Sequence, residues 1–177
     1  MKLIEPTTGY ADGIRAYRQE FLRSGESMDG TSSLRKYDDP GDWIAYLARC
    51  KDPATRPAGH VPATQYIFVR EEDEKIVGMI DVRHTLDNDH LAKFGGHIGY
   101  SVAPSERRKG YAALMLKTVL PIVKGLGIGR ALVTCDRVNE ASRRTILKNG
   151  GVYESTVFDP DEQMDVERYW IDLSDIT

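Results

Sequence analysis

The stretch of residues 95–116, GGHIGYSVAPSERRKGYAALML, constrains the fold of this chain more than any other part of it. Apolar side chains alternate from His97 to Val102, which predicts a strand. Pro104 has no N–H to donate to a neighbouring strand, so the strand ends there. A helix with an apolar stripe is predicted to begin at about Gly110. This strand, loop and helix predict a chain of the α/β class.

The loop between this strand and this helix is basic and contains one glycine. Backbone N–H groups at the start of a helix have no intrahelical acceptor, and they carry partial positive charge. Gly110 has no Cβ, so the backbone can approach a ligand closely. The loop therefore predicts a phosphate-binding site, although an ordinary solvated turn would have a similar composition. The predicted ligand-binding residues are Arg107, Arg108, Lys109, Gly110, Tyr111 and Ala112.

The overall composition narrows the class of protein. A chain of 177 residues predicts a single domain over residues 1–177. A net charge of −3 and a pI near 5.8 argue against a nucleic-acid partner. Cys50 and Cys135 follow no metal-binding or disulfide spacing, so we expect no metal and a reducing cytoplasm. No apolar run is long enough for a membrane span, and residues 1–10 do not resemble a secretory signal.

The first half of the chain predicts two helices and a hairpin. Helical spacing of apolar residues indicates a helix over 10–23 and a second helix capped by Asp42. Polar, Gly- and Pro-rich loops are expected at 24–42 and 51–62. Strands are predicted at 63–70 and 75–85. Ile76, Gly78, Ile80 and Val82 are expected on one face of the second strand, and Val77, Met79, Asp81 and Arg83 on the other.

The second half predicts a helix from Gly110 to about Gly125, in which Pro121 should cause a kink or an early end. A strand over 131–135 follows, and then a helix that begins at Asn139 or Glu140. Two final strands are expected at 152–158 and 164–173.

This order of elements, together with the R-x-x-G-x-A run at 107–112, resembles the GNAT superfamily of acetyl-CoA-dependent N-acetyltransferases over about residues 63–158. The resemblance implies a mixed, mostly antiparallel sheet of six or seven strands flanked by about four helices. It also implies acetyl transfer from acetyl-CoA to a primary amine of a small molecule or peptide. The two polar loops would cover the acceptor, and a homodimer is a common assembly in the superfamily.

The resemblance also implies where the cofactor binds. In the superfamily the strands that correspond to 97–102 and 131–135 splay apart, because the first carries a bulge. The pantetheine arm fills the gap, which places it at Tyr100, Ser101 and Val102. The backbone N–H near Val102 would polarise the thioester carbonyl. Asn139 and Ser142 would lie beside the coenzyme, although Asn139 is also a good helix N-cap without any ligand.

One position departs from the family pattern. Many relatives have a tyrosine seven residues after the asparagine, where it protonates the leaving thiolate, but this chain has Ile146. Tyr100, Tyr111 and Cys135 are alternative donors, and a thiol with a pKa near 8.5 is also able to leave without one. The departure keeps a second function open, a non-catalytic acyl-CoA-binding sensor. A nucleotide-binding module is the other alternative for the basic loop.

Two residues are predicted to deprotonate the acceptor amine. His97 opens the strand that would carry the coenzyme, and histidine titrates near neutral pH. A buried structural histidine at the strand edge is an equal alternative. Asp81 lies in an apolar strand, where a carboxylate needs a partner such as Arg83 or a ligand. Cys135 is interpreted as a small buried residue rather than a nucleophile.

Overall fold

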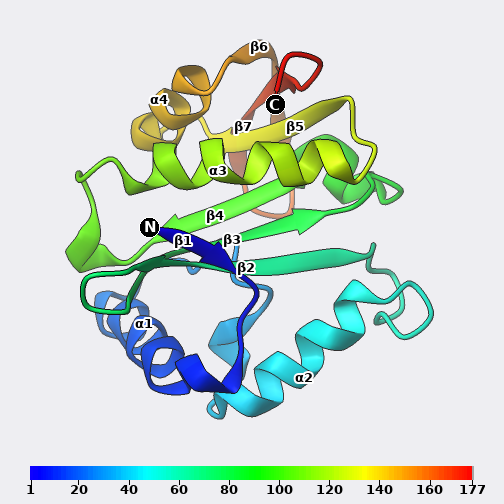
Figure 1. Cartoon of the computed structure of the whole chain (residues 1–177). Helices are drawn as coiled ribbons and strands as arrows, with labels where there is room; N and C mark the ends of the chain where they lie inside the picture. The colour runs from blue at the N-terminus through cyan, green and yellow to red at the C-terminus, as the bar shows by residue number, and fades with distance from the viewer. Residues whose placement is uncertain (177) are drawn as a thin grey trace.

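A computed structural model describes residues 1–176, which build one seven-stranded sheet with the strand order β1-β2-β3-β4-β5-β7-β6 (Figure 1). The strands are β1 (Lys2–Ile4), β2 (Ala63–Arg70), β3 (Lys75–Arg83), β4 (Ile98–Val102), β5 (Arg130–Asp136), β6 (Gly151–Asp159) and β7 (Met164–Asp172). Neighbouring strands are antiparallel except β4 and β5, which are parallel. The predicted mixed, mostly antiparallel sheet is therefore confirmed.

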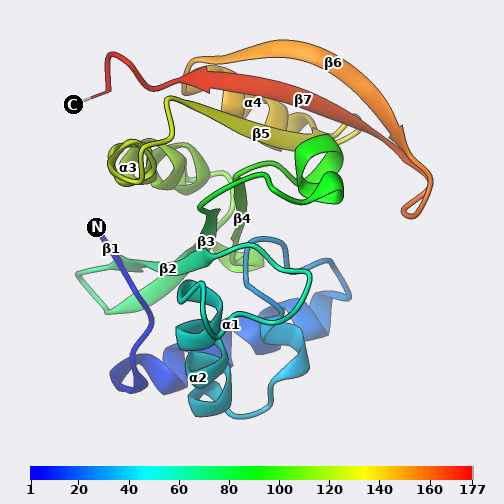
Figure 2. The same ribbon diagram turned by 90° about the vertical axis from the view of Figure 1, so that its right-hand side faces the viewer.

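Four α-helices cover the two faces of the sheet (Figure 2). Helices α1 (Ala11–Ser24) and α2 (Pro40–Lys51) enclose one apolar core with β2 and β3. Helices α3 (Tyr111–Gly125) and α4 (Glu140–Lys148) enclose a second core on the opposite face. Short 3-10 turns at 8–10, 34–36 and 104–106 and a π-helical turn at 91–95 complete the described helices. Among residues 1–176, no helix has the length and apolar character needed to cross a membrane.

The N-terminus of α2 differs from the prediction. Asp39, not Asp42, is the N-cap, and its Oδ1 accepts a hydrogen bond of 2.7 Å from the Gly41 N–H. Pro40 occupies the first helical position, where its missing N–H and fixed φ are favourable. Asp42 lies in the first turn instead. In the sequence, Pro40 was the residue that indicated this earlier start of α2.

The face assignment of β3 was wrong for its first residues. Phe68 pairs with Gly78, but the next residue, Val69, pairs with Ile76, so Val77 is an extra residue in the ladder. Such a β-bulge reverses the alternation of side chains on one side of it. Ile76 consequently packs on the α1 face, while Val77 joins the core beneath α3.

The early end predicted at Pro121 is not found, because α3 continues to Gly125. Pro121 is exposed and lies near the end of the helix. The carbonyl four residues earlier, which loses its donor, belongs to exposed Lys117. The lost hydrogen bond therefore lies on the exposed side of the helix.

The parallel strands β4 and β5 pair only where the first residue of β4 meets the middle of β5. Their one pairing joins Ile98 to Val133, next to a hydrogen bond of 2.8 Å from the His97 N–H to the Leu132 oxygen. The predicted splay of these strands is present. The predicted bulge in β4 is not, because its register with β3 has no shift from Ile98 to Val102.

Candidate functional site

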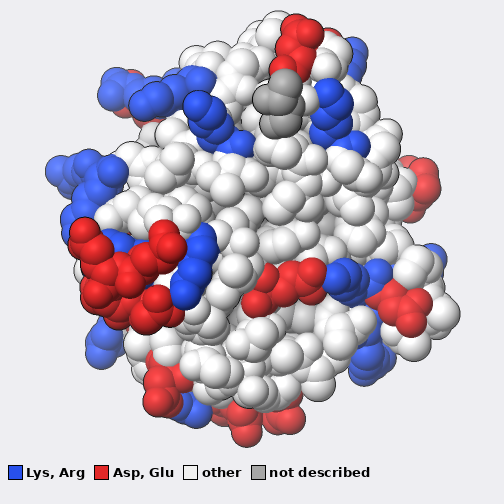
Figure 3. Space-filling model, viewed as in Figure 1, with Lys and Arg blue, Asp and Glu red and all other residues white. Residues whose placement is uncertain are grey.

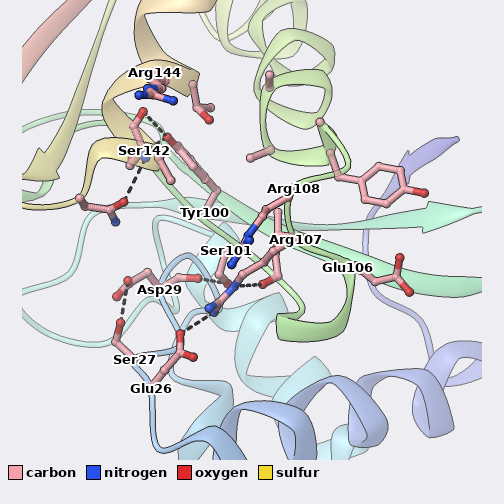
Figure 4. A pocket seen from close by; sticks show the side chains of 18 of the residues that line it. Glu26, Ser27, Asp29, Tyr100, Ser101, Glu106, Arg107, Arg108, Ser142 and Arg144 are labelled. Atoms are coloured by element: carbon pink, nitrogen blue, oxygen red, sulfur yellow. Dashed lines mark hydrogen bonds and ion pairs between the residues drawn. The ribbon is translucent and has the colours of Figure 1, made fainter.

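A first cavity of about 710 Å³ lies where β4 and β5 have separated (Figure 4). Its lining comes from the end of β4, the basic loop (residues 107–112), the start of α3, α4 and the loop after α1. The volume lies within the range of small-molecule sites. Every residue predicted to bind the cofactor lines this cavity, except Lys109. The predicted residues in its lining are Tyr100, Ser101, Val102, Arg107, Arg108, Gly110, Tyr111, Ala112, Asn139 and Ser142.

The basic loop presents free backbone N–H groups to this cavity. Arg108 and Gly110 adopt left-handed φ angles of 62° and 83°, which aligns the loop with the start of α3. The first N–H to bond back to the Gly110 oxygen is that of Leu114, at 3.1 Å. No side chain caps this helix within residues 1–176. The amides of the first turn therefore remain available to an anion.

The cationic side chains of the first cavity differ in how they are paired. Arg107 forms an ion pair of 2.6 Å with Glu26, and its Nε lies 3.4 Å from the Val102 oxygen. Arg108 has no carboxylate partner among the described residues. Arg144 and Lys148 of α4 add two further cations to the lining. Blue side chains accordingly gather beside the start of α3 and around α4 (Figure 3).

Lys109 has a different role from the one predicted. Its ammonium lies 2.9 Å from Glu106, a buried carboxylate that also accepts from Arg70 and Lys75, each at 2.8 Å. These cations, Lys75 first, lower the pKa of Glu106 to about 2. Arg70 also donates to the Tyr111 hydroxyl at 3.2 Å. Glu106 thus joins β2, β3 and the basic loop.

Glu106→Gln is expected to remove an acid-sensitive part of the stability. A carboxylate whose pKa is depressed on folding contributes stability above its unfolded pKa, about 4.3, and loses it as the pH falls toward 2. Wild-type protein should therefore lose more unfolding free energy than Glu106→Gln between pH 5 and about 2. Urea unfolding at several pH values measures this difference. Parallel pH curves for the two proteins would contradict the assignment.

Tyr100 extends across the gap between β4 and α4. Its hydroxyl lies 2.7 Å from the Ser142 Oγ, and burial raises its pKa (Figure 4). The Ser142 N–H donates to the Asn139 Oδ1 at 3.0 Å, so Asn139 is the N-cap of α4 as well as a residue of the cavity. The phenol therefore stays protonated. It also contacts α4, the helix that contains Ile146, where the family resemblance predicted a tyrosine.

The backbone of β4 also faces the gap. The Ala103 N–H donates to the Val77 oxygen of β3 at 3.0 Å. Because N–H directions alternate along a strand, the amides of Tyr100 and Val102 point away from β3 and toward the place that β5 has left. The amide of Ser101 points toward β3. Of the three residues predicted to pair with the pantetheine arm, only Tyr100 and Val102 thus point their N–H groups into the gap.

The Ser101 side chain instead fixes the loop after α1. Its Oγ donates to the Asp29 oxygen at 2.5 Å and lies 3.1 Å from the buried Tyr17 hydroxyl. The next residue, Gly30, lies so close to β4 that an added Cβ would be 2.3 Å from the Gly99 oxygen. Gln65 donates to the Gly30 oxygen at 2.9 Å. Residues 27–30 are therefore seated directly on β4.

A second cavity, of about 410 Å³, lies on the other side of this segment. Ser27 and Asp29 line the first cavity, while Met28 and Gly30 line the second. Asp81 lies in the second cavity with only 4% of its surface exposed.

Asp81 is paired with Arg83, as its apolar strand required. The Arg83 Nε lies 3.2 Å from Asp81 Oδ2. Burial nevertheless raises the pKa of Asp81, and the Arg83 charge opposes the shift. A carboxylate with a raised pKa is a better proton acceptor than an ordinary one.

His97 does not have the position of a base. It is 7% exposed and lines neither cavity. Its Nδ1 accepts the Leu132 N–H at 2.9 Å, which occupies that lone pair. Burial, with a smaller effect of Arg83, lowers its pKa to about 4. This geometry agrees with the alternative interpretation, a structural histidine that ties β4 to β5.

Ile146 and Cys135 belong to the core beneath α3 and α4. Ile146 is fully buried. Burial raises the pKa of the Cys135 thiol to about 11, so it is protonated at neutral pH and a poor nucleophile. No group of three or more His, Cys, Asp and Glu side chains within residues 1–176 has the arrangement of a metal site.

The sequence did not predict Arg144, Lys148 and Gly30 as residues of these cavities. Arg144 and Lys148 are four positions apart, so they lie on one face of α4, to which Thr145 also belongs. That spacing was visible in the sequence. Gly30 had no such signal, because only the docking of its loop on β4 brings it to the site. Asp29 belongs to the polar loop at 24–42 that was expected over the acceptor, and it lines the first cavity.

Residues 22–150 match the model of the "Acetyltransferase (GNAT) family". No curated protein matches this chain. A mutant of the spermidine N-acetyltransferase from Vibrio cholerae has a similar structure, with 15% identity and a TM-score of 0.66 over 98% of this chain and 96% of that one. A protein of Salmonella typhimurium named as an acetyltransferase, solved with its cofactor acetyl-CoA, is 13% identical with a TM-score of 0.65, covering 98% and 94%.

An N-acetyltransferase from Staphylococcus aureus Mu50 is 16% identical with a TM-score of 0.63, and 98% of each chain is covered. The Vibrio enzyme is also represented by a dodecameric structure. At these identities the structures show a shared fold, whereas the family model covers more than half of the chain. The chain belongs to the GNAT family of acetyltransferases, which use acetyl-CoA as a co-substrate.

Proposed function

We propose that this chain transfers the acetyl group of acetyl-CoA directly to a primary amine of a small molecule or a peptide. The observation that carries this proposal is the pair of cavities that share the segment 27–30, the first lined by β4 and the second by Asp81 and Arg83 of the neighbouring strand β3. The first contains free amides and cations, which suit the pyrophosphate of the coenzyme. The second contains a buried carboxylate, Asp81, which suits an amine.

In this proposal the basic loop and Arg108 bind the pyrophosphate, with Arg144 and Lys148 as further cations. The pantetheine arm lies along the outward amides of Tyr100 and Val102. The Val102 N–H donates to the thioester oxygen and stabilises the negative charge that develops there. Such a donor contributes about 3 kcal/mol in other enzymes.

Asp81 accepts the proton that the amine loses. The amine nitrogen forms a bond to the acetyl carbon, the carbon–sulfur bond breaks, and coenzyme A leaves as a thiolate that takes up a proton. Tyr100 is proposed to donate a hydrogen bond to that sulfur. Because burial raises its pKa, the phenol stabilises the thiolate as a donor without having to give up its proton.

Incubation with acetyl-CoA and a pool of primary amines tests the proposal. Release of free thiol that depends on the amine, with an acetylated product in the mass spectrum, is expected. Tight acetyl-CoA binding without any amine-dependent thiol release would favour the sensor function instead.

Arg108→Glu is expected to weaken acetyl-CoA binding by roughly tenfold or more, which corresponds to about 1.4 kcal/mol. The substitution places a negative charge beside the pyrophosphate, where the native arginine has no competing carboxylate. Calorimetric titration with acetyl-CoA measures the change. Lys93→Glu, an exposed charge reversal outside the first cavity, is the matched control.

Glu26→Gln should move the affinity in the opposite direction. It frees Arg107 from its 2.6 Å ion pair and makes a further cation available to the phosphates.

Unchanged affinity in Arg108→Glu would contradict the assignment of the basic loop as the pyrophosphate site.

A further inference from the structure

We propose that the second cavity selects a primary amine that carries its own anionic group, as an amino acid does, over a polyamine. This inference rests on the proposed function and names the substrate class of the acceptor site. It follows from the charges that line the cavity, from the free donors of one guanidinium, and from the backbone of a segment that also lines it.

The charges of the second cavity are balanced rather than acidic. Asp81 is the only carboxylate that lines it among the described residues. Arg83 lines it too, and its charge compensates that of Asp81. A polyamine brings two or more positive charges that each need an acidic partner, and its second charge would meet Arg83 instead. One ammonium group is all that the cavity can neutralise.

Arg83 holds a fixed position and keeps a donor for a ligand. Its Nη1 donates to the oxygens of Gly95 and Gly96, at 2.8 and 3.1 Å. Its Nε lies 3.2 Å from Asp81, whereas its Nη2 reaches that carboxylate only at 3.5 Å. Nη2 therefore has an N–H that a ligand carboxylate is able to accept. An ammonium at Asp81 and an anionic group at Nη2 would lie side by side.

The segment that contains Ser32 and Ser33 also lines the second cavity, and it offers further donors and no acid. Ser32 and Ser33 both have left-handed φ angles, 44° and 64°, and their N–H groups bond to no described residue. Trp43 holds this segment by donating its indole N–H to the oxygens of Thr31 and Ser32, at 3.1 and 3.2 Å. Strained backbone retained in this way is common at ligand sites.

Two histidine side chains add further polar groups to the lining of the second cavity. His60 and His90 line the cavity and are exposed. The His60 Nδ1 donates to the Ala58 oxygen at 3.3 Å, whereas no described residue accepts a hydrogen bond from the His90 ring, which keeps an N–H for a ligand. The cavity thus combines one acceptor for an ammonium with several donors for an oxyanion.

The test compares acceptors that differ in charge but little in shape. The probes are free L-amino acids, the methyl esters of the same amino acids, putrescine and spermidine. The expected kcat/KM is at least about tenfold higher for the best free amino acid than for its ester, because the ester lacks the anionic group. Putrescine and spermidine should be weaker than that amino acid. A preference for spermidine or for the esters would overturn the inference while leaving amine acetylation intact.

A binding measurement separates this inference from the proposed function. Calorimetry with free coenzyme A present detects acceptor binding without any transfer. If no probe is acetylated but free amino acids bind better than their esters, the proposed function fails and the selectivity stands. If neither binds, the selectivity is wrong.

His60→Glu supplies a variant that leaves the buried pair intact. An added carboxylate at the cavity should raise KM for the amino acid several-fold and lower it for putrescine. Lys117→Gln, which removes an exposed charge of α3 on the other face of the sheet and so lowers the net charge by the same one unit, controls for the overall change in charge and should leave both KM values unchanged. Identical KM shifts in the two variants would contradict a local effect.

Discussion

Asp81→Asn is expected to lower kcat/KM for amine acetylation by about 100- to 10,000-fold, the usual contribution of a general base. The substitution keeps the shape of the side chain, and its one amide oxygen is still able to accept a hydrogen bond from Arg83. What disappears is the proton acceptor in the second cavity. Acetyl-CoA affinity should stay the same, because Asp81 does not line the first cavity.

The pH profile distinguishes this role from a merely structural one. Burial raises the pKa of Asp81, so wild-type kcat/KM should rise with pH through a value above the ordinary 3.9 of aspartate. Asp81→Asn should lack that rise. Its melting temperature at neutral pH should change little, because the neutral amide avoids the cost of a buried charge.

Asp42→Asn is the matched control, since it removes an exposed carboxylate of α2 outside both cavities. A fully active Asp81→Asn enzyme with an unchanged pH profile would show that another group, or water, takes the proton. Equal losses in both variants would indicate a general effect of charge instead.

The features that the sequence predicted well are encoded over a few neighbouring residues. Pro104 ends β4, and Gly110 begins α3, because each residue restricts or frees its own backbone. The apolar alternation of β4 then fixes which of its amides face the gap. The basic loop before α3 and the helix that Asn139 caps were predictable for this reason, whereas the splay of β4 and β5 was implied by the family resemblance.

The features that were missed depend on residues far apart in the chain. Glu106 forms ion pairs with Arg70 and Lys75, which precede it by 36 and 31 positions. No local sequence pattern predicts those contacts. The bulge at Val77 depends on how β2 pairs with β3.

The two predicted bases, His97 and Asp81, also depend on contacts that the local sequence does not predict. The family resemblance placed His97 near the site, and the position of Asp81 on the neighbouring strand placed it there too. Only the fold shows that the His97 ring faces the Leu132 amide, while Asp81 opens into a cavity. A sequence names the residue types of an active site more readily than the direction in which their side chains point.

Gly30→Ala is expected to produce the largest effect of any substitution outside the charged groups. A Cβ at this position would lie 2.3 Å from the Gly99 oxygen and 2.4 Å from the Tyr100 Cα, both backbone atoms of β4. Neither is able to move without disturbing the strand that carries the outward amides. Residues 27–30 must therefore lift away from β4, and the hydrogen bonds from Gln65 and Ser101 are lost.

The collision with β4 is expected to cost about 1–3 kcal/mol of unfolding free energy, the usual range for overpacking, in addition to the penalty of an alanine with a left-handed φ. We also expect kcat/KM to fall by tenfold or more, because this segment lines both cavities. Urea unfolding and steady-state kinetics measure the two effects separately.

Gly25→Ala isolates the steric part of this effect. Gly25 has a φ of 70°, close to the 63° of Gly30, but no atom lies within 4 Å of its added Cβ. The two variants therefore share the penalty of a left-handed alanine, about 1–2 kcal/mol, and differ only in the collision with β4. If Gly30→Ala lost no more stability and activity than Gly25→Ala, the segment would not be seated on β4. The boundary between the two cavities would then have to lie elsewhere.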